Sequence, residues 1–306
     1  MSARISISLD EMVLLKADAR GFSFLPRQPV SSLLSGRHAS RLRGRGLAFE
    51  ELRHYHPGDD IRLIDWKATA RLRSTHVRVF NEERERPVLF VVDQRGPMFF
   101  GSQRAMKSVV AAELTALGAW RTLEAGDRVG GIVFNDNEIA EVRPHRSQSR
   151  LLQLFHQIVQ QNQALAGIDS PTDSGATATN RLNEALQNVL HIAKHDHLVV
   201  LISDLDGADS DTHRLSTLIA ARNDMLVAGI YDPLGASLRG GSGMVATDRE
   251  ESWEIPVEAS FTEKFQQSFQ NRLDEWRQVF RNLKIPVIPV STSTSPAEQI
   301  RSLLGH

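Results

Sequence analysis

The sequence predicts an α/β protein built on a doubly wound, mostly parallel sheet. Three continuous apolar runs suit strands that are buried on both faces: Val88–Val92, His197–Ser203 and Met225–Tyr231. Segments with helical periodicity, each ten or more residues long, separate these runs along the chain. Strands that alternate with such helices imply right-handed crossovers and a sheet covered by helices on both faces.

The composition excludes several classes of protein. The 306 residues include no Cys, which excludes disulfide frameworks, thiol nucleophiles and Cys-ligated metals. We expect neither a secretory signal nor a membrane span, and therefore a cytoplasmic protein. Residues 20–80 hold twelve Lys or Arg against five Asp or Glu, a balance of +7 in a chain whose total is −1. A basic segment of this kind indicates either an acidic partner or internal ion pairing.

The first 85 residues are predicted to form an N-terminal extension. Residues 1–20 suggest a short amphipathic helix with Met12, Leu15 and Ala19 on one face, and Gly21–Gly46 is an Arg-rich loop or arm. The remainder, 86–306, is predicted to be the sheet domain, with a β-rich excursion at 232–260.

The other predicted elements of the sheet domain follow in chain order. Helices are expected at Lys107–Glu124, Leu151–Gln163, Arg181–Lys194 and His213–Arg222. A second strand, Arg128–Phe134, is followed by a hairpin partner at Glu138–Arg143. An aromatic stripe from Phe261 to Phe280 indicates a helix that packs on the sheet. The last strand, Ile285–Val290, contains Pro286 and Pro289, which favour a sheet edge.

Two strands end in aspartate, and this places a candidate site at the carboxyl end of the sheet. Asp93 and Asp204 would lie on the same edge, where open parallel sheets bind ligands. A divalent cation between them, completed by hydroxyl oxygens such as Ser102 or Ser203, is one interpretation. The alternative is that each aspartate only caps a helix or shapes a turn.

The chain resembles a von Willebrand factor A-type domain in three elements: the apolar strand that ends at Asp93, the Thr-rich helix start near Asn180 and the LVVLISD run that ends at Asp204. The resemblance implies a metal-ion-dependent adhesion site that begins D-x-S-x-S, adds a later Thr and ends with an Asp. Asp93 and Asp204 match this pattern, but Arg95 and Pro97 replace the two serines. The threonine position falls on Asn180, beside Thr179. We therefore predict a degenerate site in which Arg95 replaces the ion and pairs with both carboxylates, with Asp206 completing an interaction rim.

Residues 46–84 resemble the signature of the bacterial domain of unknown function 58 family. The pattern F-x-x-L-R-x-Y-x-P-G-D-D-x-R-x-I-D-W is met from Phe49 to Trp66, and Ala70 and Arg71 continue it. The matching polar and turn residues are Arg53, Tyr55, Pro57, Gly58, Asp59, Asp60, Arg62, Asp65, Trp66 and Arg71. Members pair this segment with a von Willebrand A-like domain, and their genes commonly neighbour those of MoxR-type AAA+ ATPases.

Three interpretations of the motif segment stay open. In the first, its aspartates and arginines anchor it to the sheet domain, with Ile64 and Trp66 as buried pegs. In the second, His54, His56, Asp59 and Asp65 form a metal-hydrolase cluster. In the third, an arm with arginines at 41, 43 and 45 binds nucleic acid.

We predict a non-catalytic assembly factor or adaptor that docks through the rim or the basic arm, with a nucleic-acid-binding module and a metal-dependent hydrolase as the alternatives. The resemblance implies a MoxR-type AAA+ ATPase as partner, together with a client protein. This chain has no phosphate-binding G-x-x-x-x-G-K-[ST] motif of its own. We expect no cofactor, with magnesium or manganese on the rim as the alternative, and we expect neither a membrane nor a nucleic acid as partner.

Overall fold

A computed structural model describes residues 3–19, 47–82, 86–166, 174–234, 245–248, 251–254, 267, 280 and 283–304. It describes the backbone alone at 47–50, 79–82, 166, 174–180, 245–248, 251–254 and 303–304. The chain divides into two compact units. The motif unit is Gln28–Glu85, and the sheet unit joins Met1–Arg27 to Arg86–His306.

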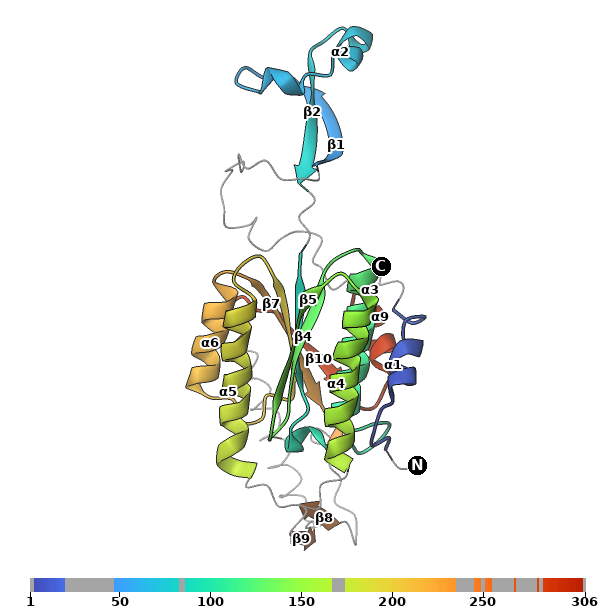
Figure 1. The fold of residues 1–306 in the computed structure, drawn as a ribbon, viewed down its shortest axis with the longest axis vertical. Helices are drawn as coiled ribbons and strands as arrows, with labels where there is room; N and C mark the ends of the chain where they lie inside the picture. Colours follow the sequence, from blue (N-terminus) through green and yellow to red (C-terminus); the bar gives the residue numbers. More distant parts are fainter. Residues whose placement is uncertain are drawn as a thin grey trace. The chain divides into compact units, whose positions relative to one another are not determined.

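The sheet unit is built around a six-stranded, mostly parallel sheet, as predicted (Figure 1). Its strands are β3 (Val88–Asp93), β4 (Val129–Phe134), β5 (Ile139–His145), β6 (Leu198–Ser203), β7 (Asp224–Tyr231) and β10 (Val287–Ser291). The spatial order is β10-β7-β6-β3-β4-β5, and only β5 runs antiparallel. From β3 the chain adds β4 and β5 on one side, and β6, β7 and β10 are then added on the other side of β3. The topological switch point therefore lies between β3 and β6.

Helices cover both faces of this sheet because its central strands are apolar on both sides. Phe90 and Val92 of β3 join one buried cluster, whereas Leu89 and Val91 join the other. The first face packs against α3 (Lys107–Glu124), α4 (Gln148–Ala166) and α9 (Pro296–Leu304). The second packs against α5 (Ser174–Ile192) and α6 (Ser210–Ala220). Period-2 alternation within unbroken apolar runs thus produces the doubly wound architecture.

Several boundaries differ from the predicted ones. Helix α5 begins at Ser174, seven residues before the predicted start at Arg181. The sequence did not indicate this earlier start, because Ser174–Asn180 is polar and carries no apolar periodicity. Helix α9 was not predicted at all. Among the described strands β10 lies at the edge of the sheet, as its two prolines predict, and it pairs there with β7 alone. In the β-rich excursion, β8 (Val245–Asp248) and β9 (Glu251–Glu254) pair antiparallel. Of the aromatic stripe only Phe280 lies among the described residues, and it is buried.

The N-terminal helix belongs to the sheet unit and not, as we expected, to one extension of 85 residues. Helix α1 (Leu9–Leu14) begins with a capping box between Ser8 and Glu11. Met12 is fully buried, and its carbonyl accepts a hydrogen bond from Trp120 Nε1 of α3 at 3.0 Å. Arg4 adds a parallel β-bridge to Ala105. The apolar face of α1 therefore fixes the start of the chain against α3.

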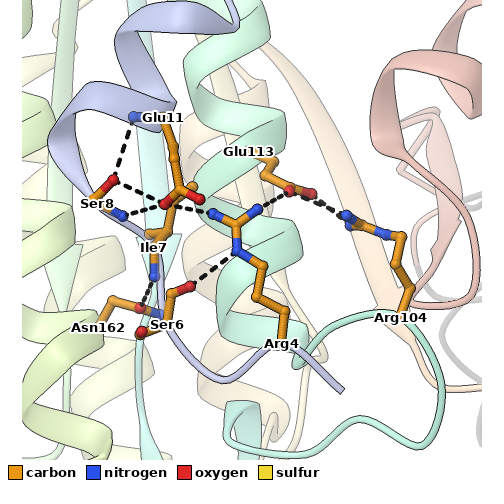
Figure 2. Close-up of polar contacts among 8 residues, drawn as sticks. All are labelled: Arg4, Ser6, Ile7, Ser8, Glu11, Arg104, Glu113 and Asn162. Atoms are coloured by element: carbon orange, nitrogen blue, oxygen red, sulfur yellow. Dashed lines mark hydrogen bonds and ion pairs between the residues drawn. The ribbon is translucent and has the colours of Figure 1, made fainter. Parts of the chain in front are cut away.

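A buried carboxylate completes this attachment (Figure 2). Glu113 of α3 is 5% exposed and accepts hydrogen bonds from both Arg4 Nη1 and Arg104 Nη1 at 3.1 Å. Arg4 also pairs with Glu11, at 2.7 Å between Nη2 and Oε2. Two arginines from separate segments thus share one helix carboxylate, which ties the N-terminal segment to the loop before α3.

The motif unit is a twisted ribbon of two strands with a long connection. Strands β1 (Leu47–His54) and β2 (His76–Glu82) pair antiparallel, with a bulge between Phe49 and Glu51. The connection holds a 3-10 helix, η2 (Ile61–Leu63), and helix α2 (Trp66–Leu72), so both lie at the same end of the ribbon. Asp60 caps η2 and Asp65 caps α2.

Candidate functional site

The strongest candidate site lies at the carboxyl ends of β3 and β6, beside the switch point. Asp93 is the last residue of β3, and Asp204 follows the last residue of β6. In the turn at 203–206, which contains Asp204, Leu205 adopts a left-handed φ of 59° and its N–H bonds to Ser203 Oγ at 2.9 Å. A leucine in this backbone region costs energy, which the surrounding hydrogen bonds must offset.

Arg95 satisfies the buried carboxylate of Asp93. Its Nε donates to Oδ1 at 2.9 Å and its Nη2 to Oδ2 at 2.6 Å, and both side chains are 0% exposed. The Arg95 backbone N–H bonds to the same Oδ1, and the Ser203 hydroxyl donates to Oδ2 at 2.6 Å. Four donors therefore occupy the roughly four lone-pair sites of a carboxylate. This donor set does not fit a divalent cation at Asp93, since no lone pair is left to bind one.

The electrostatics of this pair are those of a closed ion pair. Burial lowers the pKa of Arg95, but the charge of Asp93 and the hydrogen bonds to it outweigh burial, so the pKa of the guanidinium is raised. Arg95 also lies 5.5 Å from the centroid of the Phe134 ring and donates to the Asp206 carbonyl at 3.1 Å. The cation is thus fixed by β4 and by the turn after β6 as well as by Asp93.

Asp204 has a different cation from the predicted one. Its Oδ2 pairs with Lys107 Nζ, at the first turn of α3, and its Oδ1 accepts the Asp206 N–H at 3.0 Å. Burial raises the pKa of Asp204, but the charge and hydrogen bond of Lys107 outweigh burial, so this pKa is lowered. Arg95 therefore does not hold both carboxylates by direct bonds. Sequence reasoning missed Lys107, although its place where α3 begins, after the β3 loop, was a usable signal.

The remaining predicted ligands do not all meet at the rim. The side chains of Thr179 and Asn180 lie outside the described residues, and only their backbone in α5 is described. Ser102 bonds instead to Asp232 at the end of β7, donating its N–H at 2.8 Å and its hydroxyl. The Thr292 hydroxyl donates to the same carboxylate. Burial raises the pKa of Asp232, but these hydrogen bonds lower it further than burial raises it.

A buried polar relay connects the rim to the N-terminal segment. Gln94, between the two paired residues, donates from Nε2 to the Ser108 carbonyl and accepts from Asn162 Nδ2, both at 3.0 Å. Asn162 in turn accepts the Ile7 N–H at 3.0 Å (Figure 2). The Gln94 side chain, which lies between the paired residues Asp93 and Arg95, is therefore held by α3 and α4 and is connected through Asn162 to the N-terminal segment.

In the motif unit, the predicted charges pair with each other. Arg53 binds Asp59 through two bonds of 2.7 and 2.8 Å, and Arg78 Nε binds Asp65 at 2.8 Å. The hydrogen bond from Arg53, followed by that from the His56 N–H, holds the pKa of Asp59 at about 2. Trp66 is 69% exposed, so the described part of the motif unit does not itself bury the side chain that we predicted as a peg. A ribbon without a second layer has no apolar interior to receive it.

The hydrolase cluster is not assembled. The carboxylates of Asp59 and Asp65 are occupied by arginines and backbone N–H groups. His54 packs against His76, with ring centroids 4.4 Å apart. Within the described residues no three His, Asp or Glu side chains are arranged to hold a metal ion, and no helix is long and apolar enough to cross a membrane. Pro57 and Gly58 lie in the turn that starts the connection, with a φ of 108° at Gly58, and the Tyr55 N–H bonds to the Thr75 carbonyl at 2.9 Å.

Comparison with known proteins identifies relatives across most of the chain. The chain is 25% identical over 280 residues to "Uncharacterized protein Rv1480" of Mycobacterium tuberculosis H37Rv and to "Uncharacterized protein Mb1516" of Mycobacterium bovis. Each alignment covers 91% of this chain and 85% of the relative. A solved structure of BatB from Bacteroides thetaiotaomicron aligns with a TM-score of 0.41 and 14% identity, over 70% of this chain and 95% of that one. An aerotolerance-related membrane protein of Bacteroides fragilis gives a TM-score of 0.41 at 15% identity, over 70% of this chain and 96% of its own.

The family model described as "Protein of unknown function DUF58" matches residues 51–278. This match takes in the whole connection of the motif unit, the rim and the β-rich excursion. The chain therefore belongs to the DUF58 family.

Proposed function

We propose that this protein is a non-catalytic assembly factor, an adaptor with a sheet unit of von Willebrand A type that acts with a MoxR-type AAA+ ATPase on a client protein. One observation carries the proposal: both acidic side chains that end β3 and β6 are already paired with a cation of this chain. A catalytic or metal-binding carboxylate needs free lone pairs, and those of Asp93 are occupied. Such pairing stabilises the loops of the rim for binding, and it leaves the carboxylates of Asp93 and Asp204 engaged and not free for general acid–base work.

The two alternatives have less support. A hydrolase would need the carboxylates of Asp59 and Asp65, which are bound to arginines. A nucleic-acid module would use the arginines at 41, 43 and 45, which lie outside the described residues. The role of the Arg-rich arm stays a prediction.

A binding experiment with the MoxR-type ATPase of the source organism tests the proposal. The wild type and an Arg95→Ser, Pro97→Ser double variant are each immobilised, with and without magnesium. We expect the wild type to retain the ATPase regardless of magnesium, because Arg95 already holds Asp93 and the loops around it without an ion. We expect the double variant to need magnesium, because the two serines restore hydroxyl ligands and free Asp93. Arg214→Ser, which breaks an exposed ion pair with Asp211, is the matched control.

The outcomes separate the interaction from the role of the cation. Failure of the wild type to retain the ATPase at micromolar concentration, even after crosslinking, contradicts the adaptor proposal. Retention that requires magnesium in the wild type contradicts only the substitution of a guanidinium for the ion. Equal retention of both proteins under all conditions shows that the rim does not control binding.

A further inference from the structure

The motif unit holds most of the large apolar side chains that are exposed in the described part of the chain. Nine large apolar side chains are exposed among the described residues, and five of them fall within residues 52–72. These five are Leu52, Ile61, Leu63, Trp66 and Leu72. Trp66 is 69% exposed and Ile61 is 66% exposed, and both lie in the connection between β1 and β2. Exposed apolar side chains concentrated in this way mark an interaction surface, whereas single ones do not.

This exposure follows from the architecture of the motif unit. Among its described side chains only His76 and Val77 are buried, and both belong to β2. A two-stranded ribbon has no second layer on which to bury an apolar face. The connection folds back on β2 through backbone bonds, as in the Asp65 N–H to the His76 carbonyl at 2.9 Å. It is therefore ordered by hydrogen bonds and caps, which leaves its apolar side chains outward.

The same connection carries unpaired positive charge. Asp59 and Asp65 are neutralised by Arg53 and Arg78, and Asp60 caps η2. Across the contacts that the described residues make, four cations of the connection have no carboxylate partner: Arg62, Lys67, Arg71 and Arg73. The surface at 61–73 thus combines exposed apolar groups with a surplus of cations.

We propose that residues 61–73 form a docking surface for a partner protein whose apolar contact patch is surrounded by carboxylates. This inference rests on the proposed function and names the surface that serves it. Charge complementarity favours an acidic partner, and Trp66 and the arginines are residue types that dominate binding energy at interfaces. A nucleic acid fits less well, because Ile61, Leu63 and Leu72 offer bases no stacking face. A membrane surface also fits less well, because α2 has only seven residues.

The test measures the affinity of the full chain for the same ATPase, using Trp66→Ala and Arg71→Glu. Leu218→Ala, at a 46%-exposed leucine on α6, and Arg143→Glu, at an exposed arginine on β5, are the matched controls. We expect Trp66→Ala to weaken binding about thirty-fold or more, as for a buried interface anchor. Arg71→Glu should slow association and flatten its salt dependence between roughly 0.05 and 0.3 M. Both controls should bind like the wild type.

The outcomes distinguish this inference from the proposed function. Tight binding of the wild type and of all four variants leaves the adaptor role standing and overturns the docking surface. If the wild type does not bind the ATPase, the adaptor proposal fails, and a photo-crosslinking residue at position 66 in cells then decides the surface. A crosslink to an acidic protein whose affinity falls with Trp66→Ala supports the inference. Crosslinks only to nucleic acid, to lipid or to this chain itself overturn it, as does the absence of any crosslink.

Discussion

Replacement of Arg95 by methionine should destabilise the sheet unit strongly. Methionine keeps most of the side-chain volume but removes the charge, and it can still pack against Phe134. Asp93 then keeps two of its four donors, the Ser203 hydroxyl and the backbone N–H of residue 95, while the Asp206 carbonyl loses one. Breaking a buried ion pair in this way costs about 3–5 kcal/mol, because the remaining charge stays in a poorly solvated site.

The assay for this prediction must report on the sheet unit alone. Hydrogen exchange of the β3 and β6 amides gives its free energy of opening, since both strands lie at the centre of the sheet. The control is Arg214→Met, which breaks a pair whose two side chains are each 60% exposed. That loss should stay below about 1 kcal/mol. Adding Asp93→Asn to Arg95→Met should restore at least about 2 kcal/mol, because it removes the uncompensated charge.

A small loss would refute this reasoning. If Arg95→Met costs no more than the exposed control, the carboxylate of Asp93 is not held by the guanidinium. Failure of Asp93→Asn to restore stability would show that the loss comes from packing and not from charge.

Three further changes follow from the same contacts. Gly130→Ala should lower the free energy of unfolding, measured with urea, by more than about 2 kcal/mol, because the new Cβ would lie 2.5 Å from the Pro144 nitrogen. Gly229→Ala should lower it far less, because the nearest side-chain atom is 3.8 Å from the new Cβ. The pKa of Asp232 is lowered in the folded state, so the unfolded state binds more protons at low pH. The free energy of unfolding should therefore fall as the pH drops through and below about 3.8, and Asp232→Asn should flatten this part of the pH profile. Arg4→Ala should speed hydrogen exchange in α1 while β3 amides stay protected, because this side chain ties α1 to α3.

The sheet could be predicted because its strands are buried on both faces. An unbroken run such as Val88–Val92 has few alternatives, and the polar residue that ends it sets the strand end to within one position. The start of α5 could not be predicted, since Ser174–Asn180 shows no apolar period. The structure of the motif unit was harder to predict from the sequence than the start of α5. Its ribbon and α2 are held by backbone bonds and aspartate caps, and these leave no hydrophobic periodicity to detect.

The site was predictable in position and only partly in detail. Strand ends place Asp93 and Asp204 on one edge, and a D-x-R spacing brings a guanidinium back onto its own carboxylate. The partner of Asp204 depends on where α3 starts and on how the loop before it is held. That loop is fixed by Arg4, which lies 100 residues before Arg104, and by Asp232, which lies 130 residues after Ser102. Such a contact exists only once the chain has folded.

The two candidate surfaces differ in what a partner could touch. Asp93 and Arg95 are 0% exposed, so they act on a partner only by shaping the loops around them. Trp66 is 69% exposed and contributes nothing to a core. Substitution of Arg95 should therefore lower binding only as far as it lowers stability, and cooling should restore both. Substitution of Trp66 should lower binding while stability is unchanged. If both losses of binding followed stability, neither surface would contact the partner directly, and the interaction would have to lie elsewhere on the chain.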